Sequence, residues 1–329
     1  MVEYNAPIRD YEFLFNEMFD ALPIVQNLGY DFDSDFLSML TEGWAEHAKE
    51  VWLPINQLGD RVGLKFDDGN IFMPEEFKSA YNESIEGGWL STACKTEHGG
   101  MGVPLFFQTV TWAEIGTSTN MAMSVLPALT LGVYDVLVEH GERELIDYFA
   151  SKLASGKWAG TMCLTEPHAG TDLGIISTKA VPQDDGSYRV TGTKIFITYG
   201  EHDMSENIVH LVLAKLPDAP EGSKGISLFV VPKFLPDAAG NPGERNGVSC
   251  GSLEHKMGIH GNATCVMNFD GATGYLVGAP NKGLACMFTM MNAARLGVGI
   301  QGLGLMEASF QNSLSYARDR LQMRGLSGV

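Results

Sequence analysis

The sequence predicts a multidomain α and β protein, in which an N-terminal helical domain is followed by a central β-barrel or sandwich and then by the start of a C-terminal helical bundle. Three observations predict this order. Apolar residues repeat with a helical period in residues 1–158, β-branched residues broken by turns dominate residues 159–278, and a helical pattern returns in residues 279–329. A chain of 329 residues is also long enough for more than one hydrophobic core.

The first domain is predicted to be mainly helical. Between residues 36 and 53 apolar residues recur close to every 3.6 residues, and we expect this helix to stop at Pro54. Pro74 suits the start of a second helix, which the pair Gly87-Gly88 ends. Further helices are expected at residues 105–115, at residues 121–139 with interruptions at Pro127 and Gly132, and at residues 142–153.

The central domain is predicted from short β-branched stretches separated by turns. The sequence Asp184-Asp185-Gly186 is typical of a hairpin turn, and strand residues follow it up to Thr198. Residues 208–214 and 226–231 are short apolar strands with a Pro/Gly-rich loop between them. The pattern favours a small barrel or sandwich over a parallel sheet with crossover helices.

The last segment is predicted to be helical from about residue 281 to the end, without a recognisable stop. Residues 297–302 fit the pattern G-x-G-x-x-G, but they lie within this helical pattern rather than after a strand. Close helix packing is therefore favoured over dinucleotide binding. Arg295 and several glycines interrupt the apolar stretch 287–310, so a buried helix explains it better than a membrane span.

The composition narrows the class of protein. The net charge is −18, from 40 acidic and 22 basic residues. This charge disfavours electrostatic binding to nucleic acid or to an anionic membrane. The five cysteines are scattered and include no C-x-x-C pair, as is typical of reduced thiols in a cytoplasmic protein. Cys250, His255, His260 and Cys265 have four-residue spacers that do not suit a zinc site, so no metal site is expected.

The most informative stretch is residues 161–198, TMCLTEPHAGTDLGIISTKAVPQDDGSYRVTGTKIFIT. It joins a polar turn, interrupted by Pro167, Gly170 and Gly174, to a hairpin whose return strand ends in Phe196-Ile197-Thr198. Such a turn brings backbone N–H groups and small hydroxyls close together. The stretch therefore suits a flat ligand that carries negative charge.

This stretch resembles the flavin-binding strand and loop of acyl-CoA dehydrogenases, and the resemblance extends over essentially the whole chain. It is strongest at residues 89–104, 158–174, 188–231 and 253–269. There the sequence most resembles the long-form bacterial subgroup that includes the 3-methylmercaptopropionyl-CoA dehydrogenases. The resemblance implies a helical domain at 1–158 with a short family extension at 1–35, a flavin-binding β domain at 159–278, and a C-terminal helical domain that begins at 279 and is cut short.

The resemblance assigns FAD as the cofactor. In the family, the Thr hydroxyl and backbone donors of the loop stabilise charge that builds up on the flavin ring, and the aromatic of the return strand packs beside it. Phe196 stands where the family has Trp, so the stacking face remains but the indole N–H is missing. The residues assigned to FAD binding are Met162, Leu164, Thr165, Gly170, Thr171, Phe196, Ile197, Thr198, Arg320 and Gln322.

The resemblance also assigns substrate contacts. Thr171, where the family usually has Ser, and Asn292, where relatives often have Asp, are matched to substrate-binding positions together with Arg295. Arg295 in an apolar helix is costly unless it is paired, so a functional role or a buried salt bridge is expected. Arg320 and Gln322 match an element that reaches the flavin pyrophosphate of a neighbouring subunit.

The expected activity is FAD-dependent α,β-dehydrogenation of an acyl-CoA thioester, with electrons passed to an electron-transfer flavoprotein by a homodimer or tetramer. The general-base Glu of this branch is expected beyond Val329, and neither Glu166 nor Glu201 matches it. The alternatives are a catalytically incompetent flavin-binding fragment and an acyl-CoA oxidase-type enzyme. A DNA-associated relative of the same fold is disfavoured by the net charge of −18 and the lack of a basic tail.

Overall fold

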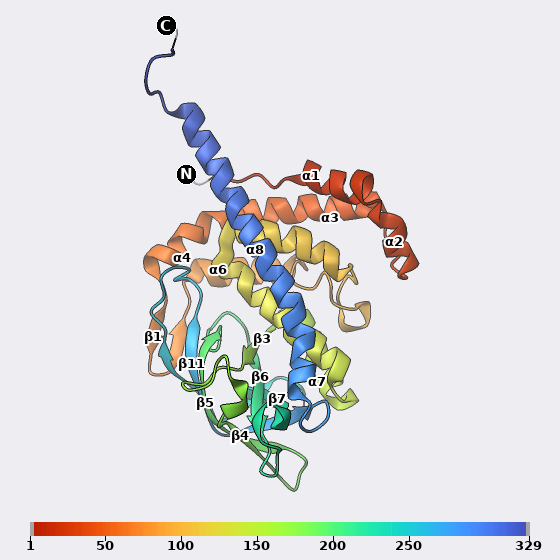
Figure 1. Ribbon diagram of the computed structural model, residues 1–329, viewed down its shortest axis with the longest axis vertical. Coiled ribbons are helices and arrows are strands. Elements are labelled where there is room, and N and C mark those ends of the chain that lie inside the picture. The colour runs from red at the N-terminus through yellow and green to blue at the C-terminus, as the bar shows by residue number, and fades with distance from the viewer. Residues whose placement is uncertain (1–2, 238, 327–329) are drawn as a thin grey trace.

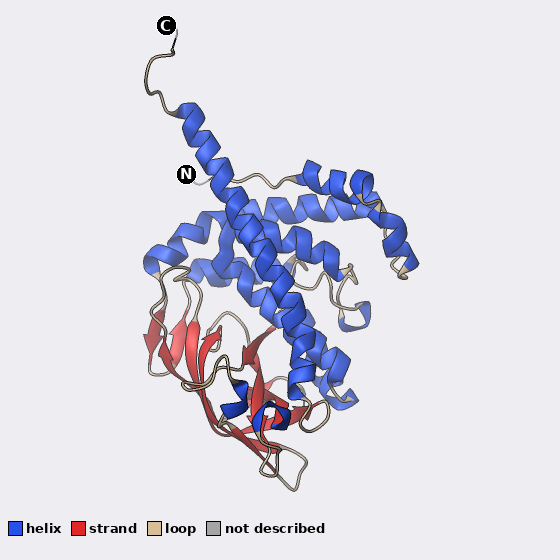
Figure 2. Cartoon of the chain, in the orientation of Figure 1, coloured by secondary structure: helices blue, strands red, loops and turns tan. Residues whose placement is uncertain are grey.

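The predicted fold class is confirmed: a helical part and a β part lie side by side, and one long helix runs along both (Figures 1 and 2). The computed structural model describes residues 3–237 and 239–326. The helical part contains the α-helices α1 (Ile8–Glu12), α2 (Ala21–Asn27), α3 (Ser34–His47), α4 (Asn56–Val62), α5 (Glu75–Glu86), α6 (Leu105–His140) and α7 (Arg143–Ala154).

The helical path does not end at Pro54 as predicted. After α3, which Asp33 caps by accepting a hydrogen bond from the Phe36 N–H at 2.8 Å, the chain continues through a π-helical turn (Ala48–Trp52) and a 3₁₀ turn (Leu53–Ile55) into α4. Pro54 is tolerated because it lies in the first turn of a new segment, where its missing N–H has no partner to lose. The hairpin of β1 (Lys65–Asp67) and β2 (Asn70–Phe72) was not predicted.

The helices expected at residues 105–115 and 121–139 form one long element, α6, which bends at Asn120 rather than at Pro127 or Gly132. Asn120 has non-helical backbone angles (φ −157°, ψ 92°), and its Oδ1 accepts a hydrogen bond from the Met123 N–H at 3.1 Å. Its side chain therefore caps the second half of the helix, as asparagine does at a helix start. Pro127 lies inside that second half.

The β part is a closed barrel. β7 pairs with both β6 and β11, so the path β11–β5–β4–β6–β7 returns to its start, and β3 and β10 extend it at either side. The β3–β6 pair is parallel, while most of the others are antiparallel. The strands of this sheet are β3 (Trp158–Cys163), β4 (Lys179–Pro182), β5 (Tyr188–Thr198), β6 (Asn207–Lys215), β7 (Ile226–Pro232), β10 (Val248–Leu253) and β11 (Thr264–Val277). The strands β8 (Phe234–Pro236) and β9 (Pro242–Arg245) form a separate two-stranded sheet.

The barrel packs on the second half of α6 through a close approach at Gly160 on β3. The Gly160 N–H donates to the Thr130 Oγ1 at 3.1 Å, and a Cβ at this glycine would lie 2.7 Å from the Val133 side chain. Any larger residue would push β3 away from α6, so glycine is required here.

The last helix, α8 (Gly283–Asp319), lies antiparallel to α6 and projects beyond the rest of the fold towards the C-terminus (Figure 1). Its first turns are buried, with Met287 and Met290 in the core, but Val298 and Phe310 are 63% and 60% exposed. The expectation of a buried helix at 287–310 is therefore wrong for most of its length, because only one side of α8 contacts α6. Both α6 and α8 are long and apolar enough to cross a membrane by length and composition alone.

Candidate functional site

The loop after β3 is held in place by one buried carboxylate, Glu166. Its Oε2 accepts hydrogen bonds from the N–H and Oγ of Ser177 (2.7 and 2.8 Å), and its Oε1 accepts from the N–H and Oγ1 of Thr178 (3.0 and 2.6 Å). The Nζ of Lys194 lies 2.9 Å from the same Oε1. Both carboxylate oxygens are therefore fully used within the fold.

Burial alone would raise the pKa of Glu166, but the charge of Lys194 and the hydrogen bonds from Thr178 and Ser177 outweigh it and lower the pKa to about 2. A carboxylate held in this way is a poor proton acceptor. That the general base is a residue other than Glu166 stays a prediction.

The two halves of the predicted flavin motif meet directly. The Ile195 N–H donates to the Thr165 carbonyl at 2.8 Å, and the Lys194 Nζ donates to the Leu164 carbonyl at 3.0 Å. The loop after β3 and the end of β5 therefore form one surface. Of the residues predicted there, Met162, Leu164, Thr165 and Thr198 are half-buried, and Gly170 and Thr171 are exposed.

Phe196 is the most exposed aromatic of this surface, with 59% of its area accessible. Its backbone is left-handed (φ 59°), a conformation that costs energy for a bulky residue and is concentrated at functional sites. Ile197 points the other way and is buried in the barrel core, so it can reach a ligand only through its backbone.

The strand end beyond Thr198 is tied to the helical part of the molecule. The Tyr199 hydroxyl donates to the Ala122 carbonyl of α6 at 2.6 Å. Asp203 accepts a hydrogen bond from the Met73 N–H at 2.9 Å and pairs with Lys78 at 2.6 Å. These contacts fix the orientation of the Phe196 surface relative to α6.

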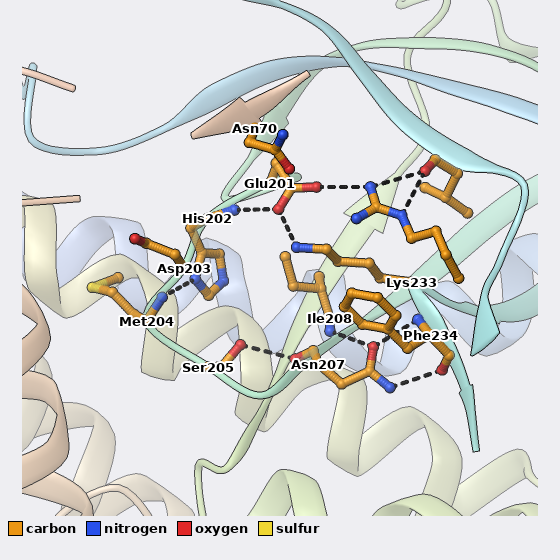
Figure 3. Close-up of polar contacts among 12 residues, drawn as sticks. Asn70, Glu201, His202, Asp203, Met204, Ser205, Asn207, Ile208, Lys233 and Phe234 are labelled. Carbon is orange, nitrogen blue, oxygen red and sulfur yellow. Dashed lines mark hydrogen bonds and ion pairs between the residues drawn. The ribbon is translucent and has the colours of Figure 1, made fainter. Parts of the chain in front are cut away.

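A second buried carboxylate, Glu201, holds the same segment from the barrel side (Figure 3). Its Oε1 pairs with the Nζ of Lys233, and its Oε2 lies 3.2 Å from the Nη2 of Arg245. Burial, together with the charge of Lys233, lowers the pKa of the neighbouring His202 to about 3, so that imidazole is neutral. Glu201 is thus engaged by two cations.

A cavity of about 260 Å³ lies between α6, α8 and the tryptophan-rich part of the helical core. Its wall is mostly apolar, and Trp44 and Trp112 stack within it at a centroid distance of 5.7 Å. The α6 segment that lines it packs against β3 at Gly160, two residues before Met162. The same part of α6 therefore contacts the barrel through Thr130 and lines the cavity through Leu131, Gly132 and Asp135. Its lining includes Trp52, Trp89, Gln108, Thr117, Ser124, Ala128, Asp135, Met290, Ala294 and Gln301.

Asn292 and Arg295 lie on the exposed side of the first turns of α8, beside this cavity. The Arg295 Nη1 donates to the Asn292 Oδ1 at 3.0 Å, and the guanidinium lies over the Phe288 ring at 5.3 Å. The expected buried salt bridge is not formed, because the side chain points to solvent. Its exposure leaves the guanidinium available to a ligand.

Arg320 and Gln322 are not brought to the flavin surface of the same chain. α8 ends at Asp319, so the expected helix through these residues is wrong, and they follow it at the far end of the molecule (Figure 1). The Arg320 Nε donates to the Gln322 Oε1 at 2.9 Å. A role for this pair would require a second subunit, as the resemblance implies.

The G-x-G-x-x-G stretch lies inside α8, which excludes the strand–turn–helix context of a dinucleotide site. The predicted close packing is also wrong there: nothing lies within 4 Å of a Cβ built on Gly297, Gly299 or Gly302. The close approach is at Gly304, where a Cβ would meet the Glu114 carbonyl of α6 at 2.7 Å. Within residues 3–237 and 239–326, no group of three His, Cys, Asp or Glu side chains is placed to hold a metal ion.

No local pattern in the sequence predicts the cavity itself. Trp44, Trp89 and Trp112 are far apart in the sequence, and each reads as an ordinary core residue. Asp135, in the apolar helical stretch after Pro127, was the available signal, because a carboxylate on the core side of a helix is unusual. Burial, with a smaller contribution from Glu139, raises the pKa of Asp135 to about 7.

Comparison with known proteins supports one family. Residues 161–272 match the family model "Acyl-CoA dehydrogenase, middle domain". The chain is 46% identical over 327 residues to 3-methylmercaptopropionyl-CoA dehydrogenase of Ruegeria pomeroyi, covering 99% of this chain and 55% of that protein. It is 38% identical to a broad-specificity linear acyl-CoA dehydrogenase of Mycobacterium tuberculosis, covering 98% and 54%. The chain thus spans about half the length of these relatives.

Solved structures share the fold. The chain superposes on Caenorhabditis elegans ACDH-11, solved in complex with C11-CoA, with a TM-score of 0.77 at 20% identity, covering 97% of this chain and 54% of that one. Butyryl-CoA dehydrogenase of Megasphaera elsdenii gives a TM-score of 0.73 at 23% identity, covering 90% and 72%. The matched middle domain, the relatives along the chain and the shared architecture agree: this chain belongs to the acyl-CoA dehydrogenase family.

Proposed function

We propose that this chain carries the FAD site and the acyl site of an acyl-CoA dehydrogenase, which oxidises an acyl-CoA thioester to the 2-enoyl-CoA. One observation carries the proposal: the exposed Phe196 ring and the Thr165 loop form one surface on the barrel, and the helix that packs against this barrel, α6, lines an apolar cavity together with α8. Family membership supports the same reaction.

The residues on this surface fit a flavin. Phe196 offers an aromatic face for a flat ring, and its left-handed backbone keeps that face exposed. Thr165, Thr171 and the glycine-containing turn offer hydroxyls and backbone N–H groups for polar edges and phosphate. FAD bound there would supply the hydride acceptor for the substrate β-carbon. The protein's own part is to hold this surface rigid through Glu166 and Lys194.

The cavity suits a short or medium acyl chain. Its wall is apolar, and the tryptophans around Trp44 offer faces that also suit a polarisable thioether sulfur. We propose that 3-methylmercaptopropionyl-CoA and butanoyl-CoA are substrates. The first is suggested by the name of the Ruegeria pomeroyi relative, and the second by that of a 37%-identical butyryl-CoA dehydrogenase of Syntrophomonas wolfei. The exposed Arg295 beside the cavity would meet the phosphate-bearing part of coenzyme A.

We further propose that the base that removes the α-proton is neither Glu166 nor Glu201, since each is held in a buried ion pair. We propose that it lies in the part of the relatives that residues 1–329 do not span. The proposed electron acceptor is an electron-transfer flavoprotein, and the proposed compartment is the cytoplasm.

An anaerobic titration tests these proposals. Residues 1–329, loaded with FAD, are compared with a chimera in which the rest of the Ruegeria pomeroyi relative follows residue 329. Butanoyl-, octanoyl- and 3-methylmercaptopropionyl-CoA are added, and the visible absorbance of the flavin is followed.

The chimera should be bleached, and residues 1–329 alone should bind FAD without bleaching, because general-base catalysis contributes typically ~10²–10⁴-fold. Equal bleaching of both proteins would place the base within residues 1–329. Bound flavin that no acyl-CoA bleaches in either protein would identify a binding module. Rapid reoxidation by oxygen would identify an oxidase.

A further inference from the structure

Asp135 is the one ionisable residue among the described residues that line the cavity. It lies in the second half of α6, and among residues 3–237 and 239–326 no hydrogen bond or ion pair to its carboxyl is formed. The other polar residues of the wall are neutral amides and hydroxyls. Burying a carboxyl group in an apolar wall costs free energy unless the group forms a hydrogen bond or an ion pair. A ligand in the cavity could supply that missing partner.

The position of Asp135 along the cavity follows from the contacts between α6 and α8. A Cβ on Gly132 would touch the Met290 side chain at 2.6 Å, and His140 Nε2 lies 2.8 Å from Thr289 Oγ1. Asp135 lies between these two contacts, so it faces the first turns of α8. Asn292 and Arg295 follow Met290 on α8, in the direction of Gly304.

At the other end of the contact between α6 and α8, the Ser118 Oγ donates to the Gly304 carbonyl at 2.9 Å. The tryptophans of the wall come from α3, the turn after it, the segment after α5 and the first half of α6. Asp135, in the second half of α6, is therefore at the end of the cavity away from Trp112. A ligand with its apolar tail among the tryptophans would place its polar connecting arm beside Asp135.

We propose that Asp135 contacts substrate, with its carboxylate accepting a hydrogen bond from an amide N–H of the pantetheine arm of an acyl-CoA. The inference rests on the proposed function and adds a residue to it. An amide N–H is the donor that coenzyme A offers between its phosphates and its thioester, and a carboxylate is a strong acceptor for it.

The charged and titratable groups around Asp135 give the site a pH dependence. On α6 itself Glu139 raises the pKa of Asp135, after the larger effect of burial, to about 7. From the segment between α5 and α6, Cys94 lies near it, while the Lys95 backbone N–H and the His98 Nδ1 bond to the hydroxyl of the neighbouring Tyr134. On α8 the cation Arg295 is exposed to solvent and its Nη1 donates to Asn292.

The direction of the pH dependence follows from the role of the Asp135 carboxylate as a hydrogen-bond acceptor. An amide N–H binds the ionised carboxylate better than the protonated acid, so binding lowers the pKa of Asp135 and releases a proton. Affinity should rise with pH between 6 and 8. With a pKa near 7, the ionised fraction changes from about a tenth to about nine-tenths over that range, so the expected gain is about tenfold.

The test is isothermal titration of the FAD-loaded protein with S-butyl-coenzyme A, a thioether that cannot lose an α-proton by the proposed reaction. Binding is measured at pH 6, 7 and 8 in two buffers of different ionisation enthalpy, which reports proton release. Asp135→Leu should weaken binding at pH 8 by about ten- to a hundredfold, as expected for a hydrogen bond to a charged group. Asp135→Asn should bind with little pH dependence, because its Oδ1 still accepts.

Two further variants sharpen the result. Glu139→Gln should move the pH profile to lower pH, because it removes a charge that raises the pKa of Asp135. Glu144→Gln, on the exposed side of α7, is the matched control and should leave the profile unchanged. Equal affinity of wild type, Asp135→Leu and Asp135→Asn at pH 8 would overturn the inference alone, as would proton uptake on binding. No binding by the wild type would overturn the proposed function with it.

Discussion

The Nζ of Lys194 lies 2.9 Å from Oε1 of Glu166, and both side chains are completely enclosed by the fold. This pair joins β5 to the loop after β3, and each of the two segments carries half of the proposed flavin surface. The rigidity of that surface therefore depends on a charge pair that solvent does not reach.

Breaking this pair from one side should be strongly destabilising. Glu166→Gln leaves the Lys194 ammonium buried with a neutral partner, and we expect a loss of about 3–5 kcal/mol in the free energy of unfolding. Adding Lys194→Met should recover part of the loss, because the orphaned charge is removed. Urea denaturation measures both.

The control is Asp147→Asn, which breaks the exposed pair with Arg143 and should cost less than about 1 kcal/mol. Equal losses for Glu166→Gln and Asp147→Asn would contradict the structural role of the buried pair.

Acid should weaken the fold through Glu166. Its pKa of about 2 lies below the ordinary value of 4.5, so the folded state favours the ionised form. The stability that it contributes is complete above pH 4.5 and is lost as the pH falls towards 2. Between pH 5 and pH 3, wild type should therefore lose stability more steeply than Glu166→Gln in urea denaturation. Parallel pH profiles for the two proteins would count against the assignment.

Asp135 should make the stability of the fold depend on pH in the opposite direction to Glu166. Its pKa of about 7 in the fold lies above the ordinary value of 3.8, so folding favours the protonated acid. Stability should decline as the pH rises from 4 through 7, and Asp135→Asn should remove this decline. Thermal unfolding of ligand-free protein between pH 5 and pH 8 measures it. A variant that is less stable than wild type at pH 8 would show that the carboxylate has a favourable partner.

Tyr199 should couple the barrel to α6. Tyr199→Phe removes its hydrogen bond to the Ala122 carbonyl, for an expected loss of about 1 kcal/mol in stability and faster hydrogen exchange near residue 122. Tyr30→Phe, at a half-buried tyrosine in the N-terminal segment, is the control and should change neither. Unchanged exchange in Tyr199→Phe would mean that other contacts hold the two parts together.

Much of the fold could be predicted because local patterns and tertiary structure agree. The β-branched stretches up to Thr198 and Val231 became barrel strands, and the Asp185-Gly186 turn became the hairpin between β4 and β5. The barrel closure through β7 could not be read, since it depends on pairings between strands that are distant in the sequence. The bend of α6 was placed wrongly because a side-chain cap at Asn120 decides it, and Pro127 is the stronger local signal.

The site was predicted only in part. Contiguous motifs identified the Thr165 loop and the Phe196 strand end, and the structure places them together. The chemistry of Glu166 could not be read from its position in the motif, because its partners Ser177, Thr178 and Lys194 reach it only through the fold. The cavity wall is assembled from several helices, so no local pattern marks it.

The most direct measurement of the central claim is an equilibrium titration of the protein with FAD. Phe196→Ala should weaken FAD binding by about three- to tenfold, the effect of one aromatic stacking contact, and Phe196→Trp should bind at least as tightly as wild type. The matched control is Phe310→Ala, since Phe310 is 60% exposed on α8 against 59% for Phe196. FAD affinity that falls in Phe196→Ala and not in Phe310→Ala is the predicted result, and equal affinity in wild type, Phe196→Ala and Phe310→Ala would contradict it.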